Sequence, residues 1–279
     1  MSVTPPELPS FDLVLASVDR VAQLRQLLAS LGRQTHKDFR VLLVDQNPDD
    51  RLEEVLRDHA SLRVEHLRSA RGLARARNVA LGRVVADLVA FPDDDCVYAP
   101  DLLERVAGRF AADPELDGLT GRAVDASGAS SPSWPLDPAQ LTQENVWNRV
   151  ISFALFLRSS LLPGIGEFDE QLGLGSGTPW SSGEETEYLI RAVRSGARIE
   201  YDPELVVQHD EKPVRRSLGA REGASLGYIL RKHGYPAGTV ARMVVRPAGG
   251  VLVALAQGDR ERARFQLETL RGRIRGYRS

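Results

Sequence analysis

Cysteine is nearly absent from this sequence, with Cys96 the single one among 279 residues. An intramolecular disulfide is therefore impossible, and a chain of this length can bury a sufficient core without one. Residues 1–7 contain no basic region followed by an apolar core, so no secretory signal is predicted there. Both absences are typical of a reducing compartment. We expect a cytoplasmic protein, either free or at the inner face of the cell membrane.

Long hydrophobic runs are also missing. The longest, such as residues 150–157, are much shorter than the roughly 20 apolar residues that a membrane-spanning helix needs. The sequence therefore predicts no membrane-spanning segment.

Two glycine motifs of nucleotide-binding proteins are absent as well. Residues 17–21, after the first expected strand, contain no glycine, which disfavours a dinucleotide-dependent oxidoreductase. No Gly-x-x-x-x-Gly-Lys occurs, which disfavours a phosphate-cradling nucleotide hydrolase. Aromatic residues make up only 6% of the chain and do not alternate with basic ones, so no nucleic-acid partner is expected.

The near-neutral net charge of −2 conceals two opposed regions. Residues 1–210 carry 21 Lys and Arg against 33 Asp and Glu, whereas residues 211–279 carry 15 against 5. The sequence therefore predicts an acidic domain over 1–210 and a basic extension over 211–279.

Hydrophobic periodicity predicts strands that alternate with helices in the first hundred residues. The expected strands are 11–17, 39–45, 62–67 and 88–91, and the expected helices are 21–31, 52–59 and 73–81. This order predicts an α/β fold with a parallel, doubly wound sheet. Later segments are expected as an irregular excursion over 125–146, strands at 150–157 and 205–209, a helix from 183, and helices at 213–234, 238–256 and 259–275.

An acidic triplet, Asp93-Asp94-Asp95, follows the fourth expected strand. Three adjacent carboxylates repel one another unless a cation or hydrogen-bond donors neutralise them. Oxygen ligands of this kind suit Mg²⁺ or Mn²⁺. The alternative is a solvated turn in which Asp95 or Asp101 caps the next helix.

A second acidic segment, Ser181-Ser-Gly-Glu-Glu-Thr-Glu187, begins a predicted helix. One carboxylate at such a position can act as a general base. The alternative is structural: Ser182 and Glu185 have the spacing of a capping box, and Glu187 and Arg191 that of an i,i+4 ion pair.

Two further features each allow two interpretations. His209 ends a predicted strand and can be a metal ligand or an ordinary hydrogen-bonded residue. The basic run Arg71-Gly-Leu-Ala-Arg-Ala-Arg-Asn78 can reach phosphates or form a solvated helix face.

These motifs, in this order, resemble the family 2 glycosyltransferases of the GT-A fold. The resemblance covers about residues 11–209 and depends on segments that include Ala16-Ser-Val-Asp-Arg20, Gly72-Leu-Ala-Arg-Ala-Arg-Asn78, Phe91-Pro-Asp-Asp-Asp95 and Gly183-Glu-Glu-Thr-Glu187. It implies a Rossmann-like, mostly parallel sheet flanked by helices. It further implies a nucleotide-binding half over about 1–100, an acceptor half over 101–210, and a helical C-terminal appendage.

The resemblance also implies an activity and a set of site residues. The activity is inverting transfer of a sugar from a nucleotide-diphosphate sugar to an acceptor hydroxyl, with Mn²⁺ or Mg²⁺ as cofactor, in polysaccharide or glycoconjugate synthesis. By position, Asp95 is the principal metal ligand and His209 completes the metal site, while Glu185 is the base and Glu184 flanks it. The nucleotide-sugar-binding residues are Ser17, Asp19, Arg20, Asp45, Gln46, Arg75, Arg77, Asp93 and Asp94.

The donor base and the acceptor are less well specified. Gln46 stands where many relatives have an aspartate that pairs with uracil, and an amide both donates and accepts. The acceptor is expected to be a glycan, a lipid-linked molecule or a small molecule. Trp180, just before the base segment, is the candidate for stacking on it, although packing is the alternative for this residue as for Trp134 and Trp147.

One alternative function is a catalytically degenerate protein that binds nucleotide or glycan without turnover. The presence of both the acidic triplet and Glu185 argues against it, because a binding site needs no base. The basic extension, whose cationic residues include Lys212, Arg215, Arg216, Arg221, Arg231 and Lys232, is expected either to dock on the acidic domain or to contact an anionic membrane.

Overall fold

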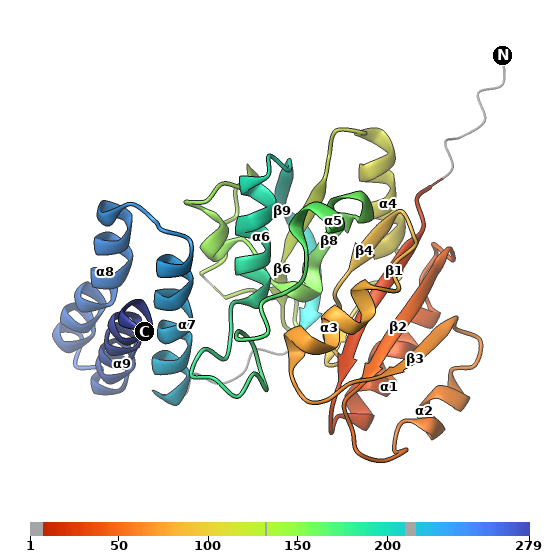
Figure 1. The fold of residues 1–279 in the computed structure, drawn as a ribbon, viewed down its shortest axis with the longest axis horizontal. Coiled ribbons are helices and arrows are strands. Elements are labelled where there is room, and N and C mark those ends of the chain that lie inside the picture. The colour runs from red at the N-terminus through yellow and green to blue at the C-terminus, as the bar shows by residue number, and fades with distance from the viewer. Residues whose placement is uncertain (1–7, 132, 210–215) are drawn as a thin grey trace. The chain divides into compact units, whose positions relative to one another are not determined.

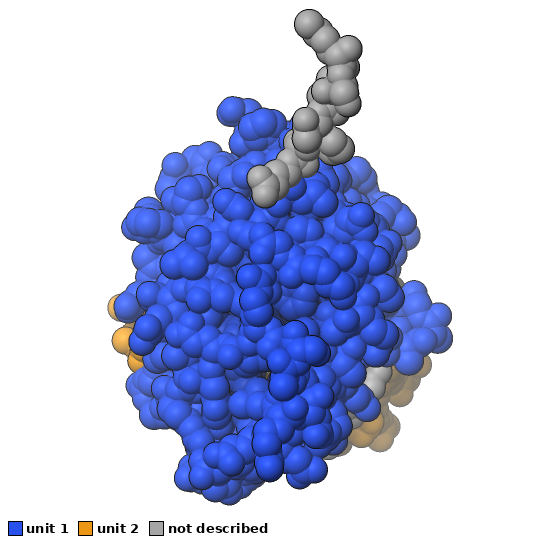
Figure 2. Space-filling model, turned by 90° about the vertical axis from the view of Figure 1, so that its right-hand side faces the viewer, with its two compact units in different colours: residues 1–71, 75–168, 188–211 blue, residues 72–74, 169–187, 212–279 orange. Residues whose placement is uncertain are grey.

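The computed structural model describes residues 8–131, 133–209 and 216–279. The chain divides into two compact units, coloured separately in Figure 2. Unit 1 comprises residues 1–71, 75–168 and 188–211, and unit 2 comprises 72–74, 169–187 and 212–279. The domain boundary expected at residue 210 lies outside the described residues and stays a prediction. Lys212, Arg215 and the side chain of Arg216 lie outside them too.

The first half of the sheet has the parallel order that the sequence predicts. It contains β1 (Phe11–Ser17), β2 (Phe39–Asp45), β3 (Val64–Arg68) and β4 (Leu88–Ala90). These strands lie in the order β3-β2-β1-β4 and all pair in parallel. Ser17 and Asp45 are direct partners in the β1–β2 register, so the polar ends of the two strands meet at one edge.

Helices cover the strands because both faces of the sheet are apolar. The helices of this half are α1 (Val21–Gly32), α2 (Glu53–Asp58), α3 (Leu73–Leu81) and α4 (Leu102–Ala112). Phe11, Leu13 and Leu15 pack into a core with Leu24 and Leu28 of α1. The intervening Val14 is 1% exposed, so this strand is buried on both sides.

The second half of the sheet is mixed. It consists of β5 (Cys96–Val97), β6 (Gly118–Val124), β7 (Ala139–Gln140), β8 (Leu155–Arg158) and β9 (Ile199–His209). Strand β8 lies between β4 and β6 and is antiparallel to both, whereas β6 and β9 are parallel. Within the described residues, nine strands form one sheet (Figure 1).

The expected strands at 150–157 and 205–209 have the largest errors in their boundaries. Residues 152–154 form a short 3₁₀ turn instead of the start of a strand, because an apolar run alone does not distinguish the two. Strand β9 begins at Ile199, six residues before its expected start, and contains Pro203. The β6–β9 register shifts between Thr120 and Arg122, and such an irregularity tolerates a proline within a strand.

The expected excursion over 125–146 contains little regular structure in its described part. Apart from β7, which pairs with β9, it consists of turns and bends. Leu141 and Val146 are nevertheless only 2% and 1% exposed, so this segment contributes to the packed interior.

The C-terminal helices confirm the three that the sequence predicts. They are α7 (Arg216–Lys232), α8 (Ala237–Ala256) and α9 (Arg260–Arg278), which lie side by side in Figure 1. The backbones of helices α7 and α9 lie in close contact at several glycines. A Cβ atom on Gly276 would lie 1.9 Å from the carbonyl oxygen of Ala224, so glycine is required there.

Helix α8 corrects one expectation from the sequence. By length and composition it is apolar enough to cross a membrane, and 17% of its most apolar 18-residue window is buried. The sequence shows no uninterrupted apolar run here, because Arg242 and Arg246 stand among the apolar residues. Core helices of soluble proteins also meet these criteria, so length and composition do not by themselves make α8 a membrane-spanning helix.

Candidate functional site

The acidic triplet lies at the carboxyl edge of the parallel strands. Asp93 forms an isolated parallel bridge with Ala16 near the end of β1, and Asp94 and Asp95 make the turn into β5. The interpretation of Asp101 as a helix cap is wrong, because its side chain makes no capping hydrogen bond at α4. The three carboxylates of the triplet, Asp93, Asp94 and Asp95, have different environments.

Asp93, Asp95 and His209 form a group that can hold a metal ion. Each offers one ligand atom, and these atoms lie within 4.8 Å of one another. Strand β5 pairs with β9 so that Cys96 faces His209, which brings the imidazole to Asp95, with Nε2 3.0 Å from Oδ1. The His209 ring is also stacked on Phe153, with ring centroids 4.6 Å apart. Two carboxylates and an imidazole suit Mn²⁺ well and are compatible with other divalent ions.

Asp94 is directed away from this group and into the protein. Its carboxylate accepts hydrogen bonds from Ser17 Oγ (2.8 Å) and Arg20 Nη1 (3.0 Å). Burial raises the pKa of Asp94 to about 6, against the opposing effect of those two donors. Arg20 also donates to Asp95, so one guanidinium neutralises two members of the triplet.

Asp93 is paired with the buried Arg77. The Arg77 side chain is 2% exposed, and its Nη2 lies 3.4 Å from Asp93 Oδ1. The guanidinium also lies over the rings of Phe91 and Phe168, at 6.0 and 5.5 Å from their centroids. Arg77 is therefore a buried support of the triplet, whereas Arg75 on the same helix is exposed.

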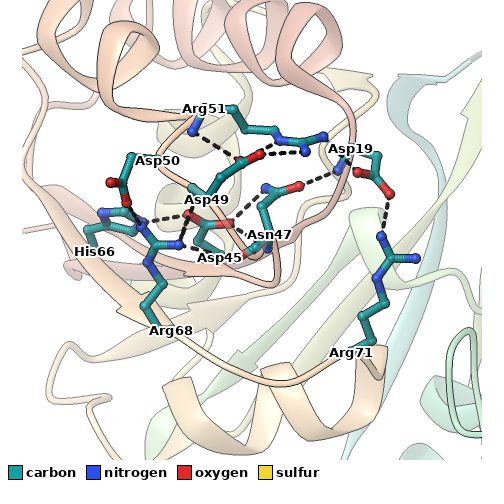
Figure 3. A network of polar contacts seen from close by, with 9 residues as sticks. All are labelled: Asp19, Asp45, Asn47, Asp49, Asp50, Arg51, His66, Arg68 and Arg71. Atoms are coloured by element: carbon teal, nitrogen blue, oxygen red, sulfur yellow. Dashed lines mark hydrogen bonds and ion pairs between the residues drawn. The ribbon is translucent and has the colours of Figure 1, made fainter.

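Asp45 is the centre of a second polar cluster at the same sheet edge, shown in Figure 3. Its fully buried carboxylate accepts from the backbone N–H and Nδ2 of Asn47, at 2.8 and 2.7 Å. His66 Nε2 and Arg68 Nη1 lie 3.0 and 3.4 Å from its other oxygen. The buried Gln46 follows Asp45, and its N–H donates to the carbonyl of Ser17.

Asp19 is joined to this cluster through the loop after β1. It has a left-handed backbone, with φ of 60°, and its N–H donates to Asn47 Oδ1. Its carboxylate accepts from Arg51 (2.8 Å) and Arg71 (2.6 Å) (Figure 3). The cluster therefore presents several guanidinium groups beside the loops where phosphates bind in sheets of this type.

The second acidic segment starts α6 (Glu184–Arg194), which follows the short α5 (Leu162–Ile165) and a glycine-rich loop. Glu184 is 5% exposed, and Glu185 is half-buried. Gly173 has φ of 88°, and a Cβ there would lie 2.9 Å from Glu184 Oε2. This glycine therefore allows the loop to pass closely over Glu184.

Glu187, three residues further along α6, is fully buried and ion-paired with α7. Lys232 Nζ lies 2.8 Å from Glu187 Oε1, and His233 Nε2 lies 3.0 Å from the same oxygen. Lys232 also donates to Asp169 Oδ2 (2.8 Å), which accepts from the hydroxyl of Tyr228. Within unit 2, the end of α7 therefore fixes both the loop and the first turn of α6.

The three tryptophans have packing partners. Trp134 packs against the core of unit 1, and the Trp147 indole N–H donates to the carbonyl of Gln143. Trp180 stacks on Tyr228 within unit 2, with ring centroids 4.0 Å apart. One face of the Trp180 indole is thus covered.

Comparison with protein families decides the family of this chain. The family described as "Glycosyl transferase family 2" matches residues 12–162, more than half of the chain. The chain belongs to glycosyl transferase family 2. The matched region contains β1 to β4, the acidic triplet and the Asp45 cluster, so the family motifs coincide with the clustered polar residues.

Curated proteins with similar sequences are named as glycosyltransferases. This family 2 chain is 28% identical over 269 residues to the pre-mycofactocin glycosyltransferase of Mycobacterium tuberculosis, which covers 90% of this chain and 53% of the relative. It is 24% identical over 224 residues to an N-acetylglucosaminyltransferase of Rhizobium meliloti, covering 72% of this chain and 51% of the relative. The chain thus spans about half the length of these curated relatives.

Solved structures support the GT-A-like fold of this family 2 protein. The mannosyltransferase PcManGT from Pyrobaculum calidifontis, in complex with GDP-Man and Mn²⁺, has a TM-score of 0.67 at 16% identity, covering 98% of this chain and 88% of its own. Residues 1–349 of S. aureus TarS in complex with UDP-GlcNAc have a TM-score of 0.62 at 16% identity, covering 94% and 91%.

Most predicted site residues of this family 2 chain lie in unit 1. Contacts link Ser17, Arg20, Asp93, Asp94, Asp95, Arg77 and His209, and a second set links Asp19 and Asp45 through Asn47. Glu184, Glu185 and Trp180 belong to unit 2. The sequence did not predict a role in the site for His66, Arg68, Lys232 or His233. The alternation of Val64-Glu-His-Leu-Arg68 could have indicated that His66 and Arg68 share one sheet face.

Proposed function

We propose that this protein is a divalent-metal-dependent, inverting glycosyltransferase that uses a nucleotide-diphosphate sugar. The observation that carries the proposal is the grouping of Asp93, Asp95 and His209 beside the polar ends of β1 and β2. A metal–diphosphate site next to a nucleoside pocket is what such a reaction requires.

Asp93, Asp95 and His209 would hold the ion. When bound, a divalent ion stabilises the negative charge that develops on the diphosphate leaving group. Arg20, which neutralises Asp94 and Asp95 in this structure, is a second cation at the same place. Both oxygens of the Asp94 carboxylate accept hydrogen bonds, from Ser17 and Arg20, so we assign Asp94 the support of these two residues rather than metal binding.

Glu185 is proposed as the general base. The acceptor hydroxyl oxygen forms a bond to the anomeric carbon while the bond from that carbon to the diphosphate oxygen breaks. The electron pair of the broken bond leaves with the diphosphate, and the hydroxyl proton passes to the Glu185 carboxylate. A single displacement of this kind inverts the anomeric configuration, as in inverting glycosidases by analogy.

The first turn of α6 is proposed to position that base. Glu187 is one turn from Glu184 and is fixed by Lys232 and His233 of the α7 end. We assign Lys232, His233 and Glu187 a positioning role for Glu185.

The donor and the acceptor are proposed at the level of chemical class. Relatives of this fold were solved with UDP-GlcNAc and with GDP-Man, which supports a nucleotide-diphosphate sugar without choosing its base. Gln46 does not select a nucleotide base either, because its amide can both donate and accept hydrogen bonds. The acceptor is proposed to be a glycan, lipid-linked or small-molecule hydroxyl compound in glycoconjugate synthesis.

A thermal-shift panel tests the proposal. UDP, GDP, dTDP and CDP are each added with and without Mn²⁺, and the melting temperature is recorded. We expect one nucleotide to stabilise the protein in a Mn²⁺-dependent way, since binding adds RT ln(1 + [L]/Kd) to the stability. Asp95→Asn is expected to lose the Mn²⁺-dependent part. Asp38→Asn, which changes an exposed carboxylate paired with Arg63, is the matched control and should keep it.

The panel separates the competing interpretations. No Mn²⁺-dependent shift with any nucleotide contradicts a metal–diphosphate site. A normal shift without nucleoside diphosphate release from any donor sugar would favour a protein that binds without turnover.

A further inference from the structure

The exposed surface of α8 is unusually apolar. Val245, Leu252, Val253 and Leu255 are 58%, 69%, 53% and 55% exposed. Solvent exposure of several large aliphatic side chains on one helix is rare in a surface that contacts only water. The apolar composition of α8 is therefore not explained by packing within unit 2.

Three of these side chains, Val245, Leu252 and Val253, lie on one face of the helix. With 3.6 residues per turn, the residues that share it are Arg242, Val245, Arg246, Gly249, Leu252, Val253 and Ala256, here called the α8 face. The opposite side carries the buried Val240, Pro247 and Ala254. That side packs on α9, where Gln266 lies against Gly250 and Arg273 donates to the carbonyl of Met243.

The α8 face is also positively charged. Residues 237–258 contain no Asp or Glu, and Arg242 and Arg246 are exposed. Burial, together with the positive charge of Arg246, lowers the pKa of the neighbouring Arg273 to about 10. Within the described part of the chain, the buried Arg273 Nε has no hydrogen-bond partner. This region therefore has an excess of cations over anions.

We propose that the α8 face binds the surface of an anionic lipid bilayer, with the aliphatic side chains at the acyl boundary and the arginines among the lipid phosphates. Charge complementarity selects this occupant, because a bilayer offers apolar contact and anions together. A second copy of the chain would bring four guanidinium groups of two α8 faces to one interface, and α8 offers no carboxylate to pair with them.

The helix lies along the surface and does not span it. One side of α8 is covered by α9, whose arginines 260, 262, 264, 271, 275 and 278 are exposed. Surrounding α8 with lipid would take these charges into the hydrocarbon or separate the two helices, and both are costly. The α8 face, in contrast, is exposed and can meet lipid without either cost.

Vesicle flotation tests this inference. The full chain is mixed with phosphatidylcholine vesicles, or with vesicles in which about a third of the lipid is phosphatidylglycerol, at low and high salt. We expect binding to the anionic vesicles, weakened by salt. Leu252→Ser with Val253→Ser should reduce the vesicle partition coefficient by roughly tenfold or more. Arg242→Gln with Arg246→Gln should reduce it by roughly thirtyfold.

Matched controls come from unit 1. Val85→Ser changes an aliphatic side chain that is 82% exposed, and Arg33→Gln changes an exposed arginine; both should bind like the unsubstituted protein. Circular dichroism should show unchanged helix content, since every substituted side chain is exposed.

Three results would overturn the inference. Equal binding to neutral and anionic vesicles excludes the proposed charge complementarity. Light scattering that shows a dimer, which Leu252→Ser dissociates, identifies a second copy as the occupant. Resistance of the membrane-bound protein to alkaline carbonate indicates a spanning helix. Flotation does not depend on sugar transfer, so its outcome is separate from that of the nucleotide panel.

Discussion

At the scale of single residues, the acidic triplet shows how neighbours of identical type acquire different roles. Asp93 and Asp95 face His209, whereas Asp94 turns inward to Ser17 and Arg20. The difference arises from the turn into β5, which points successive side chains in different directions. The mutual repulsion of the triplet is offset by Arg20 and by the buried Arg77.

Glu185→Gln tests the base at this scale. Glutamine keeps the size of the side chain but does not accept the proton, so turnover should fall by about two to four orders of magnitude. Donor binding in the thermal-shift panel should stay unchanged. The measurement is nucleoside diphosphate release in the presence of Mn²⁺. Near-normal release from this variant would remove Glu185 from the mechanism, whereas joint loss of binding and turnover would indicate a structural role.

At the scale of elements, α7 contacts the first turn of α6, which carries the proposed base Glu185. Lys232 and His233 of the basic extension contact Glu187 of α6, and Ser225 Oγ accepts a hydrogen bond from the backbone N–H of Ser182. The ends of these elements are joined by buried charge pairs, which depend strongly on geometry.

Lys232→Met tests the positioning role of α7. Removing the ammonium leaves Glu187 and Asp169 without their shared partner, so the first turn of α6 should shift. We expect kcat to fall by about 10- to 100-fold with little change in the donor KM. Lys232→Arg should restore part of the activity. The control is Arg231→Met at the adjacent exposed position, and an unchanged kcat in Lys232→Met, with only a lower melting temperature, would contradict the role.

The contact between α7 and α9 gives a second prediction for elements. Gly276→Ala places a Cβ atom 1.9 Å from the carbonyl oxygen of Ala224, so the two helices must separate. We expect a loss of about 3 kcal/mol in unfolding free energy, measured by urea denaturation. Gly249→Ala is the control, because no atom lies within 4 Å of its added Cβ. It should be neutral or stabilising by about 0.5–1 kcal/mol. Equal changes in unfolding free energy for Gly276→Ala and Gly249→Ala would show that α7 and α9 are not in close contact.

At the scale of the whole molecule, the charge division acquires a structural meaning. The acidic residues include the clusters at the carboxyl edge of the sheet, and the basic residues of the extension include the α8 face and Lys232. The net charge of −2 therefore combines an acidic unit 1 that can attract cations with helices that can attract anions.

Acid stability of the fold depends on Asp12, at the edge of the sheet opposite to the site. Burial alone would raise the pKa of Asp12, but hydrogen bonds from Arg40 and from the N–H groups of Ala86 and Val85 hold it below its ordinary value of 3.8. A carboxyl with a lowered folded pKa stabilises the fold above its unfolded pKa, and that contribution is lost as the pH falls through the folded pKa.

Asp12→Asn should therefore cost about 3 kcal/mol of unfolding free energy at pH 7, because Arg40 loses the buried one of its two carboxylate partners, Asp12 and Glu65. The difference from the unsubstituted protein should shrink below pH 3.8. Urea denaturation at pH 7, 5 and 3 measures it. Asp38→Asn, in an exposed pair, should cost at most about 1 kcal/mol at every pH. A difference for Asp12→Asn that does not depend on pH would contradict this origin.

Much of the fold was predictable because local patterns determine it. Continuous apolar runs gave β1 and β2 with their exact bounds, and Leu73–Leu81 forms the expected helix. The antiparallel position of β8 and the early start of β9 were not predictable, since strand order depends on pairing between distant segments. The Asp95–His209 contact was expected only through the family resemblance, because 114 residues separate the two in the chain.

The sequence by itself determined the α/β class, the helices of the C-terminal extension, and the types of residue available for chemistry, because composition and periodicity are local properties of the chain. The tertiary structure decided which of these residues meet. It separated Asp94 from Asp93 and Asp95, placed Lys232 and His233 on Glu187, and left the α8 face exposed. The physical reason is that burial and short-range contacts set the charge, direction and accessibility of a side chain, and both depend on segments far apart in the sequence.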